Sequence, residues 1–206
     1  MDSINKLTDL FTKLPGVGPR QARRMVFYLL RTRRDTVDEI VRLIGDLKKN
    51  VTVCQACYRH FVPPQPGVQQ CSVCSDGNRT HDTLMIVEKD VDFENIERSG
   101  TYTGMYFILG GLYSPLGKNP TGFMHIDALK QRIAELVAQY EMKEIIIALA
   151  VNPDGEETVH FLKKELHDLC ENHQLNITML GRGLSTGSEL EYADAQTIQN
   201  AFESRH

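Results

Sequence analysis

Apolar side chains recur at helical spacing through the first fifty residues. Between Ser3 and Lys13 they return every three or four positions, which predicts a helix capped by Ser3. A second helix is expected to begin at Pro19, whose fixed backbone angle suits a first turn, and a third after Asp35. Their inner faces would be Ala22, Met25, Val26, Leu29 and Leu30, and Val37, Ile40, Val41, Ile44 and Leu47. The pattern predicts a small helical unit over residues 1–50.

Short apolar runs alternate with amphipathic segments beyond residue 79. Strands are expected at residues 84–88, 106–109, 144–150 and 176–180, and helices at 91–99, 127–140 and 157–172. Strand, helix, strand in this order predicts an α/β fold, with a parallel sheet covered on both faces, over residues 79–180. A C-terminal segment, residues 181–206, begins with a glycine-containing loop and is expected to form a helix from 189 to about 204.

Composition excludes several classes of protein. The 206 residues are 41% hydrophobic and 24% charged, which is an ordinary globular composition and not that of a disordered or collagen-like chain. The longest apolar run, Ile145–Val151, is far shorter than the roughly 20 residues that a membrane span requires. The N-terminus carries an acid, Asp2, where a signal peptide has a basic region. We therefore expect a cytoplasmic protein with no membrane span.

Charge is distributed unevenly along the chain. The formal net charge is −4, but residues 1–50 hold 11 basic and 6 acidic side chains, a balance of +5. The other 156 residues hold 12 basic and 21 acidic side chains, a balance of −9. This asymmetry suggests that the N-terminal unit faces a polyanion such as DNA. The alternative is that Arg31, Arg33 and Arg34 form a solvated face without a partner.

Four of the five cysteines form two close pairs. They are Cys54, Cys57, Cys71 and Cys74, with thirteen residues between the pairs. Two Cys-x2-Cys knuckles joined by such a loop are typical of a tetrahedral zinc site. Four thiolates leave no coordination position open for water, so the zinc of this module, residues 51–78, is predicted to be structural. The alternative is a metal-free loop, and His60 is interpreted as a neighbour of the site.

The loop between the first two helices is typical of a helix-hairpin-helix element. Its sequence is Leu14-Pro-Gly-Val-Gly-Pro-Arg20. Gly16 and Gly18 let the backbone approach a phosphate, and amide groups at the start of the next helix point toward it. Arg20, Arg23 and Arg24 follow on that helix, and such contacts position DNA without reading its sequence. The alternative is that the glycines only form a tight turn.

Acidic residues follow two of the expected strands. Glu88 ends the first strand of the sheet, and Asp154, Glu156 and Glu157 are expected in the loop after the strand at 144–150. Ligand sites in parallel sheets lie beyond the carboxyl ends of the strands, and carboxylates gathered there can hold magnesium. The alternative is that the later acids only stabilise the N-terminus of the following helix through its dipole.

Four motifs, in this order, resemble those of the RecR family of bacterial recombination mediators. They are Leu14-Pro-Gly-Val-Gly-Pro19, the four cysteines, Ile108-Leu-Gly-Gly-Leu-Tyr-Ser-Pro-Leu116 and Gly181-Arg-Gly-Leu-Ser-Thr-Gly-Ser-Glu-Leu-Glu-Tyr-Ala-Asp194. The resemblance covers nearly the whole chain. It implies a helix-hairpin-helix unit, a zinc module, a Toprim domain and a C-terminal segment that helps form a ring-shaped homo-oligomer. It also implies that Arg20 and Arg24 occupy DNA-contacting positions.

The resemblance further implies partners. RecR proteins act with RecO, and in many bacteria with RecF, to load RecA onto single-stranded DNA coated by the SSB protein. We therefore predict a non-enzymatic, DNA-binding mediator of recombination and repair. The chain has no Gly-x4-Gly-Lys-Ser/Thr loop, which argues against an ATPase.

One departure concerns the acids of catalytic Toprim enzymes, which carry a Glu after the first strand and an Asp-x-Asp pair after a later one. Aligned through Asp154-Gly-Glu156, the two Asp positions fall on Ala150 and Asn152, so a two-metal phosphoryl-transfer site would lose two ligands. Glu88, Asp154 and Glu156 are then residual Toprim acids or contacts for a partner. The alternatives are a magnesium-dependent Toprim nuclease or topoisomerase-like enzyme, and a zinc module that binds only protein.

Overall fold

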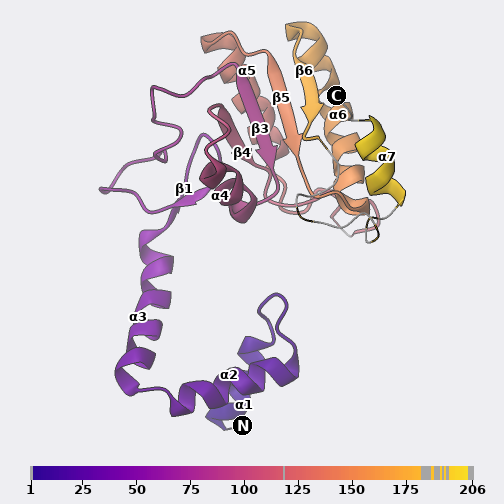
Figure 1. Ribbon diagram of the computed structural model, residues 1–206. Helices are drawn as coiled ribbons and strands as arrows, with labels where there is room; N and C mark the ends of the chain where they lie inside the picture. Colours follow the sequence, from indigo (N-terminus) through magenta and orange to yellow (C-terminus); the bar gives the residue numbers. More distant parts are fainter. Residues whose placement is uncertain are drawn as a thin grey trace. The chain divides into compact units, whose positions relative to one another are not determined.

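The computed structural model describes residues 2–117, 119–181, 187, 191, 193 and 195–203. The chain divides into two compact units, residues 1–51 and 52–206 (Figure 1). Within the described residues, no helix combines the length and the apolar character that crossing a membrane requires.

Three helices form the first unit: α1 (Ser3–Phe11), α2 (Pro19–Arg31) and α3 (Arg34–Asn50). Helix α1 is capped by Asp2 and not by Ser3 as expected, because the Asp2 carboxylate accepts a hydrogen bond from the Asn5 amide at 2.8 Å. Helix α1 packs on α2, whose inner face buries Ala22 and Val26. Leu30, expected on the same face, is exposed.

The apolar stripe of α3 differs from the expected inner face. Ile40, Val41, Ile44 and Leu47 are all exposed, and no residue of the helix is buried. Helix α3 follows the two-residue link at 32–33 and extends away from α1 and α2 (Figure 1), so these two helices do not cover its apolar stripe. Helical periodicity predicted the helix correctly, but the described residues of the first unit do not bury its apolar face.

A four-stranded parallel sheet is the centre of the second unit. Its strands are β3 (Thr83–Val87), β4 (Met105–Ile108), β5 (Glu144–Ala148) and β6 (Asn176–Met179), in the order β4-β3-β5-β6. They are connected by α4 (Asp90–Ser99), α5 (Ile126–Gln139) and α6 (Pro153–His173). A short antiparallel pair, β1 (Thr52–Val53) and β2 (His60–Phe61), precedes the sheet, and α7 (Ala195–Glu203) follows it. The predicted α/β class is confirmed.

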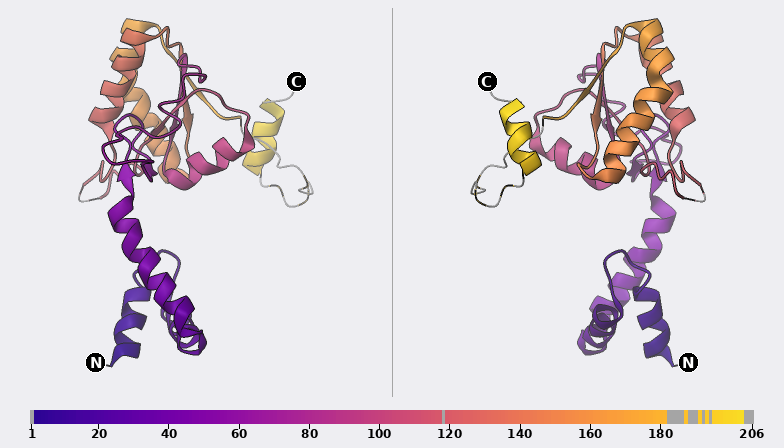
Figure 2. Two further views of the ribbon diagram at one scale, coloured as in Figure 1. Left: turned by 90° about the vertical axis from the view of Figure 1, so that its left-hand side faces the viewer. Right: turned by 90° about the vertical axis from the view of Figure 1, so that its right-hand side faces the viewer.

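Side chains of the strands alternate between two cores. Leu84 and Ile86 of β3 enter a core built with α5 and α6, whereas Met85 and Val87 enter a second core. Figure 2 shows α5 and α6 side by side on one face of the sheet and α4 on the other. The second core also contains Phe93 of α4 together with buried residues of the two cysteine knuckles.

The cysteine region is therefore built onto the sheet. The amide of Ile108, at the end of β4, donates a hydrogen bond of 2.8 Å to the carbonyl of Cys57. The ring of Tyr58 packs on Phe107 at 5.4 Å, and the guanidinium of Arg59 lies 4.6 Å from the centre of the Phe93 ring. These contacts make residues 52–78 and the sheet one folded unit.

Helix α6 begins earlier than the sequence pattern predicted. Its first residue is Pro153 and not Glu157, because the Asn152 side chain accepts a hydrogen bond from the Gly155 amide at 2.8 Å and caps the helix. A side chain at Gly155 would collide with the Ala150 carbonyl, so this close turn from β5 into α6 requires glycine. The acids predicted to lie in a loop are consequently in the first turns of a helix.

The C-terminal segment is described only in part. Helix α7 (Ala195–Glu203) lies within the helix predicted from 189 to about 204, and the predicted start at 189 lies outside the described residues. Most of the motif at 181–194, namely residues 182–186, 188–190, 192 and 194, lies outside the described residues, as does the end predicted at 204.

Candidate metal centre and nucleic-acid interface

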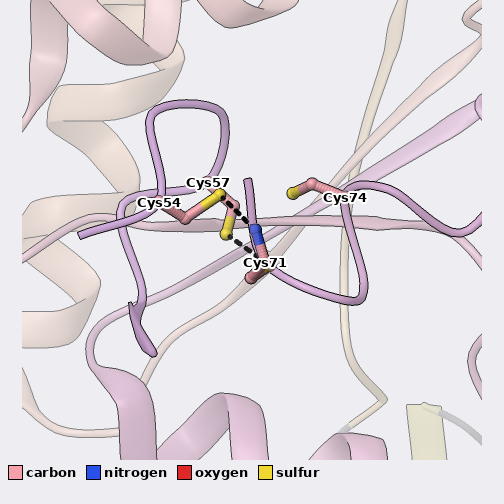
Figure 3. A group of neighbouring side chains, drawn as sticks. All are labelled: Cys54, Cys57, Cys71 and Cys74. Atoms are coloured by element: carbon pink, nitrogen blue, oxygen red, sulfur yellow. Dashed lines mark hydrogen bonds between the residues drawn. The ribbon is translucent and has the colours of Figure 1, made fainter. Parts of the chain in front are cut away.

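Two similar backbone turns bring the four cysteines together. In the first knuckle the Tyr58 amide donates to the Cys54 carbonyl at 2.9 Å, and in the second the Ser75 amide donates to the Cys71 carbonyl at 3.0 Å. Tyr58 has a positive φ of 63°, which lets the chain reverse after Cys57. All four thiols therefore point into one space between the two loops (Figure 3).

The spacing of the sulfur atoms fits a tetrahedral metal site. The four Sγ atoms lie within 4.8 Å of one another, and the Sγ atoms of Cys57 and Cys71 are 3.7 Å apart. Four ligands at the usual Zn–S distance of about 2.3 Å would be about 3.8 Å apart. Three of the cysteines are buried and Cys74 is partly exposed, and none of them forms a disulfide. This cluster can hold a metal ion.

The electrostatics of the cluster favour a cation. Hydrogen bonds from the other three thiols, that of Cys57 first, lower the pKa of Cys54. The pKa of Cys57 is raised, chiefly by its hydrogen bond to Cys54 and further by burial. Four neighbouring thiols thus cannot all ionise by themselves. A bound cation removes this conflict because it stabilises the thiolate at every position.

His60, which was interpreted from the sequence as a neighbour of the metal site, is not among the grouped ligands. Its Nδ1 lies 2.9 Å from Oδ2 of Asp90, and its amide donates to Oδ1 of the same carboxylate at 2.7 Å. This pairing ties β2 to the start of α4, so His60 connects the knuckles to the sheet unit.

The hairpin between α1 and α2 leaves helix amides available to an anion. The Val17 amide donates a hydrogen bond of 3.1 Å to the Leu14 carbonyl, and Gly16 has a φ of +75°. A tight turn with proline at its second position and glycine at its third requires this positive φ. Gly18 caps α2 without a side-chain hydrogen bond, and the first turn holds no acid. The amides of Arg20 and Gln21 therefore have no acceptor within the helix.

Six side chains form one outward face of α2, called here the arginine face. It consists of Arg20, Arg23, Arg24, Phe27, Tyr28 and Arg31, which line a groove of about 540 Å³. All six are exposed, and none of the four arginines takes part in the ion pairs found among the described residues. Arg20, Arg23 and Arg24 were predicted from the sequence as DNA contacts, whereas Phe27 and Tyr28 were not. Their spacing of three and four residues from the arginines was the available signal.

The acids at the edge of the sheet are placed differently. Glu88 follows β3 and lies 3.6 Å from the Lys89 ammonium, while Asp154 and Glu156 lie in the first turn of α6. Among the described residues, only the four cysteines form a group of three or more side chains close enough to share one ion. The position of the two α6 acids fits stabilisation by the helix dipole.

Comparison with known proteins places these features in one family. The chain matches family models for the RecR helix-hairpin-helix over residues 4–47, the Toprim domain over residues 82–181 and the RecR C-terminal region over residues 183–206.

Three similar proteins illustrate the match, and each is named Recombination protein RecR. That of Bifidobacterium animalis subsp. lactis (strain AD011) is 36% identical over 203 residues, covering 98% of this chain and 95% of that protein. That of Herpetosiphon aurantiacus is 34% identical over 208 residues, covering 99% and 94%. That of Legionella pneumophila (strain Philadelphia 1) is 32% identical over 206 residues, covering 100% and 96%. With identity of this degree over the full length and the family's models matched in order, the chain belongs to the RecR family.

Proposed function

We propose that this protein is a recombination mediator of DNA repair that binds DNA, catalyses no reaction and helps to load RecA onto SSB-coated single-stranded DNA. Membership of the RecR family supports the mediator role. The observation that carries DNA binding is the arginine face of α2 beside the amides of the hairpin. Guanidinium groups and helix amides together form a site for phosphate.

Arg20 and Arg24 are the main phosphate contacts in this proposal, with Arg23 beside them and Gly16 and Gly18 allowing the backbone to approach. The two arginines are one helical turn apart on an exposed face. Such contacts depend on charge and position, so the proposal predicts binding that varies little with DNA sequence.

The metal of the four-cysteine cluster is zinc with a structural role. The donor set of four sulfurs and the close spacing support zinc, and a fully thiolate-ligated ion has no position open for water. Cys54, Cys57, Cys71 and Cys74 would hold the ion. What zinc supplies is the cross-link between two loops that are themselves packed on the sheet.

The edge of the sheet serves as a contact for a partner protein. Glu88, Asp154 and Glu156 are the residues of this surface, and RecO, in many bacteria together with RecF, is the proposed partner. The carboxyl ends of β3 and β5, adjacent strands whose connections leave in opposite directions, are where parallel sheets offer a ligand site. The described acids do not gather for a metal ion, which supports a contact role over magnesium chemistry.

The active species is a homo-oligomer, and a ring is the arrangement that the family resemblance suggests. The exposed apolar stripe of α3 supports association, because Val41, Ile44 and Leu47 are 65%, 60% and 61% exposed in the single chain. Contiguous exposed apolar side chains of this kind are typical of protein interfaces. A magnesium-dependent nuclease or topoisomerase-like enzyme is not favoured by the names of the relatives or by the placement of the acids.

A salt series tests the proposal. Replacing both Arg20 and Arg24 by alanine should weaken binding to oligonucleotides of every sequence alike. Each lost phosphate contact flattens the plot of log affinity against log salt by about 0.7 on single strands, so the slope should become shallower by about 1.4 per bound hairpin. Fluorescence anisotropy at several salt concentrations measures both effects.

Replacing Arg33 and Arg34 by alanine is the matched control. It removes the same charge from the same unit, but these arginines already pair with Asp35 and Asp38. We expect much smaller changes in affinity and in the salt slope for this control variant. If the Arg20/Arg24 variant forms the intact oligomer and binds with unchanged affinity and slope, α2 is not the DNA-binding element.

A further inference from the structure

The arginine face of α2 combines charge with flat aromatic surface. Its six residues follow the spacing i, i+3, i+4, i+7, i+8 and i+11, so they lie along one side of the helix over about 16 Å. That length corresponds to about five stacked nucleotides at about 3.4 Å each. The two aromatic residues lie between arginines on both sides, since Arg20, Arg23 and Arg24 precede them and Arg31 follows.

Both aromatic rings are available to a ligand. Tyr28 is 68% exposed and Phe27 is 41% exposed. The Arg23 guanidinium lies 6.0 Å from the centre of the Phe27 ring. Among the described residues, no ring or guanidinium stacks on Tyr28. Phosphate binding alone requires neither ring.

We propose that Tyr28, with Phe27, forms a base-stacking site through which the arginine face selects single-stranded over double-stranded DNA. This inference rests on the proposed DNA binding by α2. Every base has a flat face that can stack on an aromatic ring, and on a single strand that face can be exposed. In a duplex the flat faces of the bases are covered by neighbouring base pairs, so the two aromatic rings add no affinity for double-stranded DNA. The arginines bind the phosphates of either form.

The chemistry of the lining favours nucleic acid as the occupant. Four of the six lining side chains are arginine and none is acidic. The unit that contains them has a balance of +5 over residues 1–50. A polyanion with exposed flat rings complements both properties at once, and interleaved aromatic and basic side chains are the recurring design of surfaces that bind single strands.

The test compares three ligands of equal length: a thymine oligonucleotide, the same sugar-phosphate chain without bases, and a duplex. The full-length protein should prefer the thymine strand over the abasic chain. Tyr28→Ala should lose about fivefold or more in affinity for the thymine strand while binding the other two unchanged. Tyr28→Phe keeps the ring and should behave as the unaltered protein, whereas Tyr28→Leu, apolar without a ring, should behave as Tyr28→Ala. Arg20→Ala should weaken binding to all three ligands alike.

A spectroscopic readout separates stacking from indirect effects. The fluorescence of 2-aminopurine within the single strand should be quenched on binding to the unaltered protein and to Tyr28→Phe, and much less on binding to Tyr28→Ala. If Tyr28→Ala weakens the affinity for all three ligands equally, or changes the mass of the protein in solution, Tyr28 supports the fold or the oligomer. Either result would overturn the inference. If the unaltered protein binds none of the ligands, the proposed DNA binding itself fails.

Discussion

Replacing Cys54 by serine removes one of four sulfur ligands from a fully buried position. Cys54 is 0% exposed, and its thiol accepts hydrogen bonds from the Cys71 amide and from the other thiols. A serine hydroxyl is a poor zinc ligand at neutral pH because it remains protonated. The variant should therefore lose zinc, and the two loops should lose their cross-link.

The size of the effect follows from how the knuckles are attached. A structural zinc contributes about 10–16 kcal/mol in small peptides, whereas a whole domain is stable by about 5–15 kcal/mol. If half of the zinc contribution remains with three thiolates, at least about 5 kcal/mol is lost. For a domain of this size each kcal/mol lowers Tm by about 2–4 °C, so Tm should fall by about 10–20 °C or more. The loss should reach the sheet, because both knuckles share a core with β3 and β4.

Cys170 provides a matched control. It is a buried cysteine of α6, 8% exposed, and it belongs to the core built with α5 and α6, whereas the three buried cysteines of the knuckles belong to the other core. Cys170→Ser makes the same chemical change without removing a ligand. Burying a hydroxyl there should cost about 1–3 kcal/mol, or about 2–12 °C in Tm, while zinc content stays unchanged.

Three measurements decide the question: zinc per chain by elemental analysis, melting by circular dichroism, and hydrogen exchange of β4. The Ile108 amide donates to the Cys57 carbonyl, so its exchange should accelerate in Cys54→Ser and not in Cys170→Ser. Cys54 is not a structural zinc ligand if Cys54→Ser retains one zinc per chain, or if this variant loses zinc and still has the same Tm as Cys170→Ser.

Two further predictions concern catalysis and pH. Supercoiled plasmid incubated with magnesium or manganese should remain intact, and cleavage that disappears in Glu88→Ala would instead identify a nuclease. Burial, with a contribution from the nearby charge of His60, lowers the pKa of His125, so folding favours its neutral form. The contribution of His125 to the free energy of unfolding should therefore be fully present above its ordinary pKa of about 6.5. It should be lost as the pH falls through the lower pKa that His125 has in the folded protein. His125→Gln should flatten this dependence in denaturant titrations, and an identical pH profile would contradict it.

The order of the elements could be predicted from the sequence because helices and strands have different apolar periods. Boundaries were harder where a cap decides them. The pair Asn152-Pro153 is a cap followed by a first-turn proline, yet the acids after it were interpreted as loop residues, so α6 was placed four residues late. The cap of α1 was wrong by one residue for a similar reason, since both Asp2 and Ser3 are capping residue types.

Contacts between side chains could be predicted from the sequence only where the contacting residues belong to one short motif. The spacing of the cysteines predicted their grouping, because two knuckles fold locally around a common centre. The hydrogen bond between Cys57 and Ile108 joins residues about fifty positions apart, and no local pattern encodes it. The stripe of α3 was predicted as an inner face, but periodicity cannot say whether the covering surface belongs to the same chain.

The separation of charge constrains how DNA can be held. Residues 51–206 have a balance of −9 and repel a polyanion, which leaves the N-terminal unit at +5 as the favourable surface. One arginine face offers at most four guanidinium groups, and binding through so few phosphate contacts is weak at physiological salt. Several faces acting on one strand remove this weakness, because each additional contact forms at high effective concentration and can raise avidity by about a hundredfold. The proposed oligomer is therefore a physical requirement of the proposed DNA binding, and the two should be lost together when the exposed stripe of α3 is made polar.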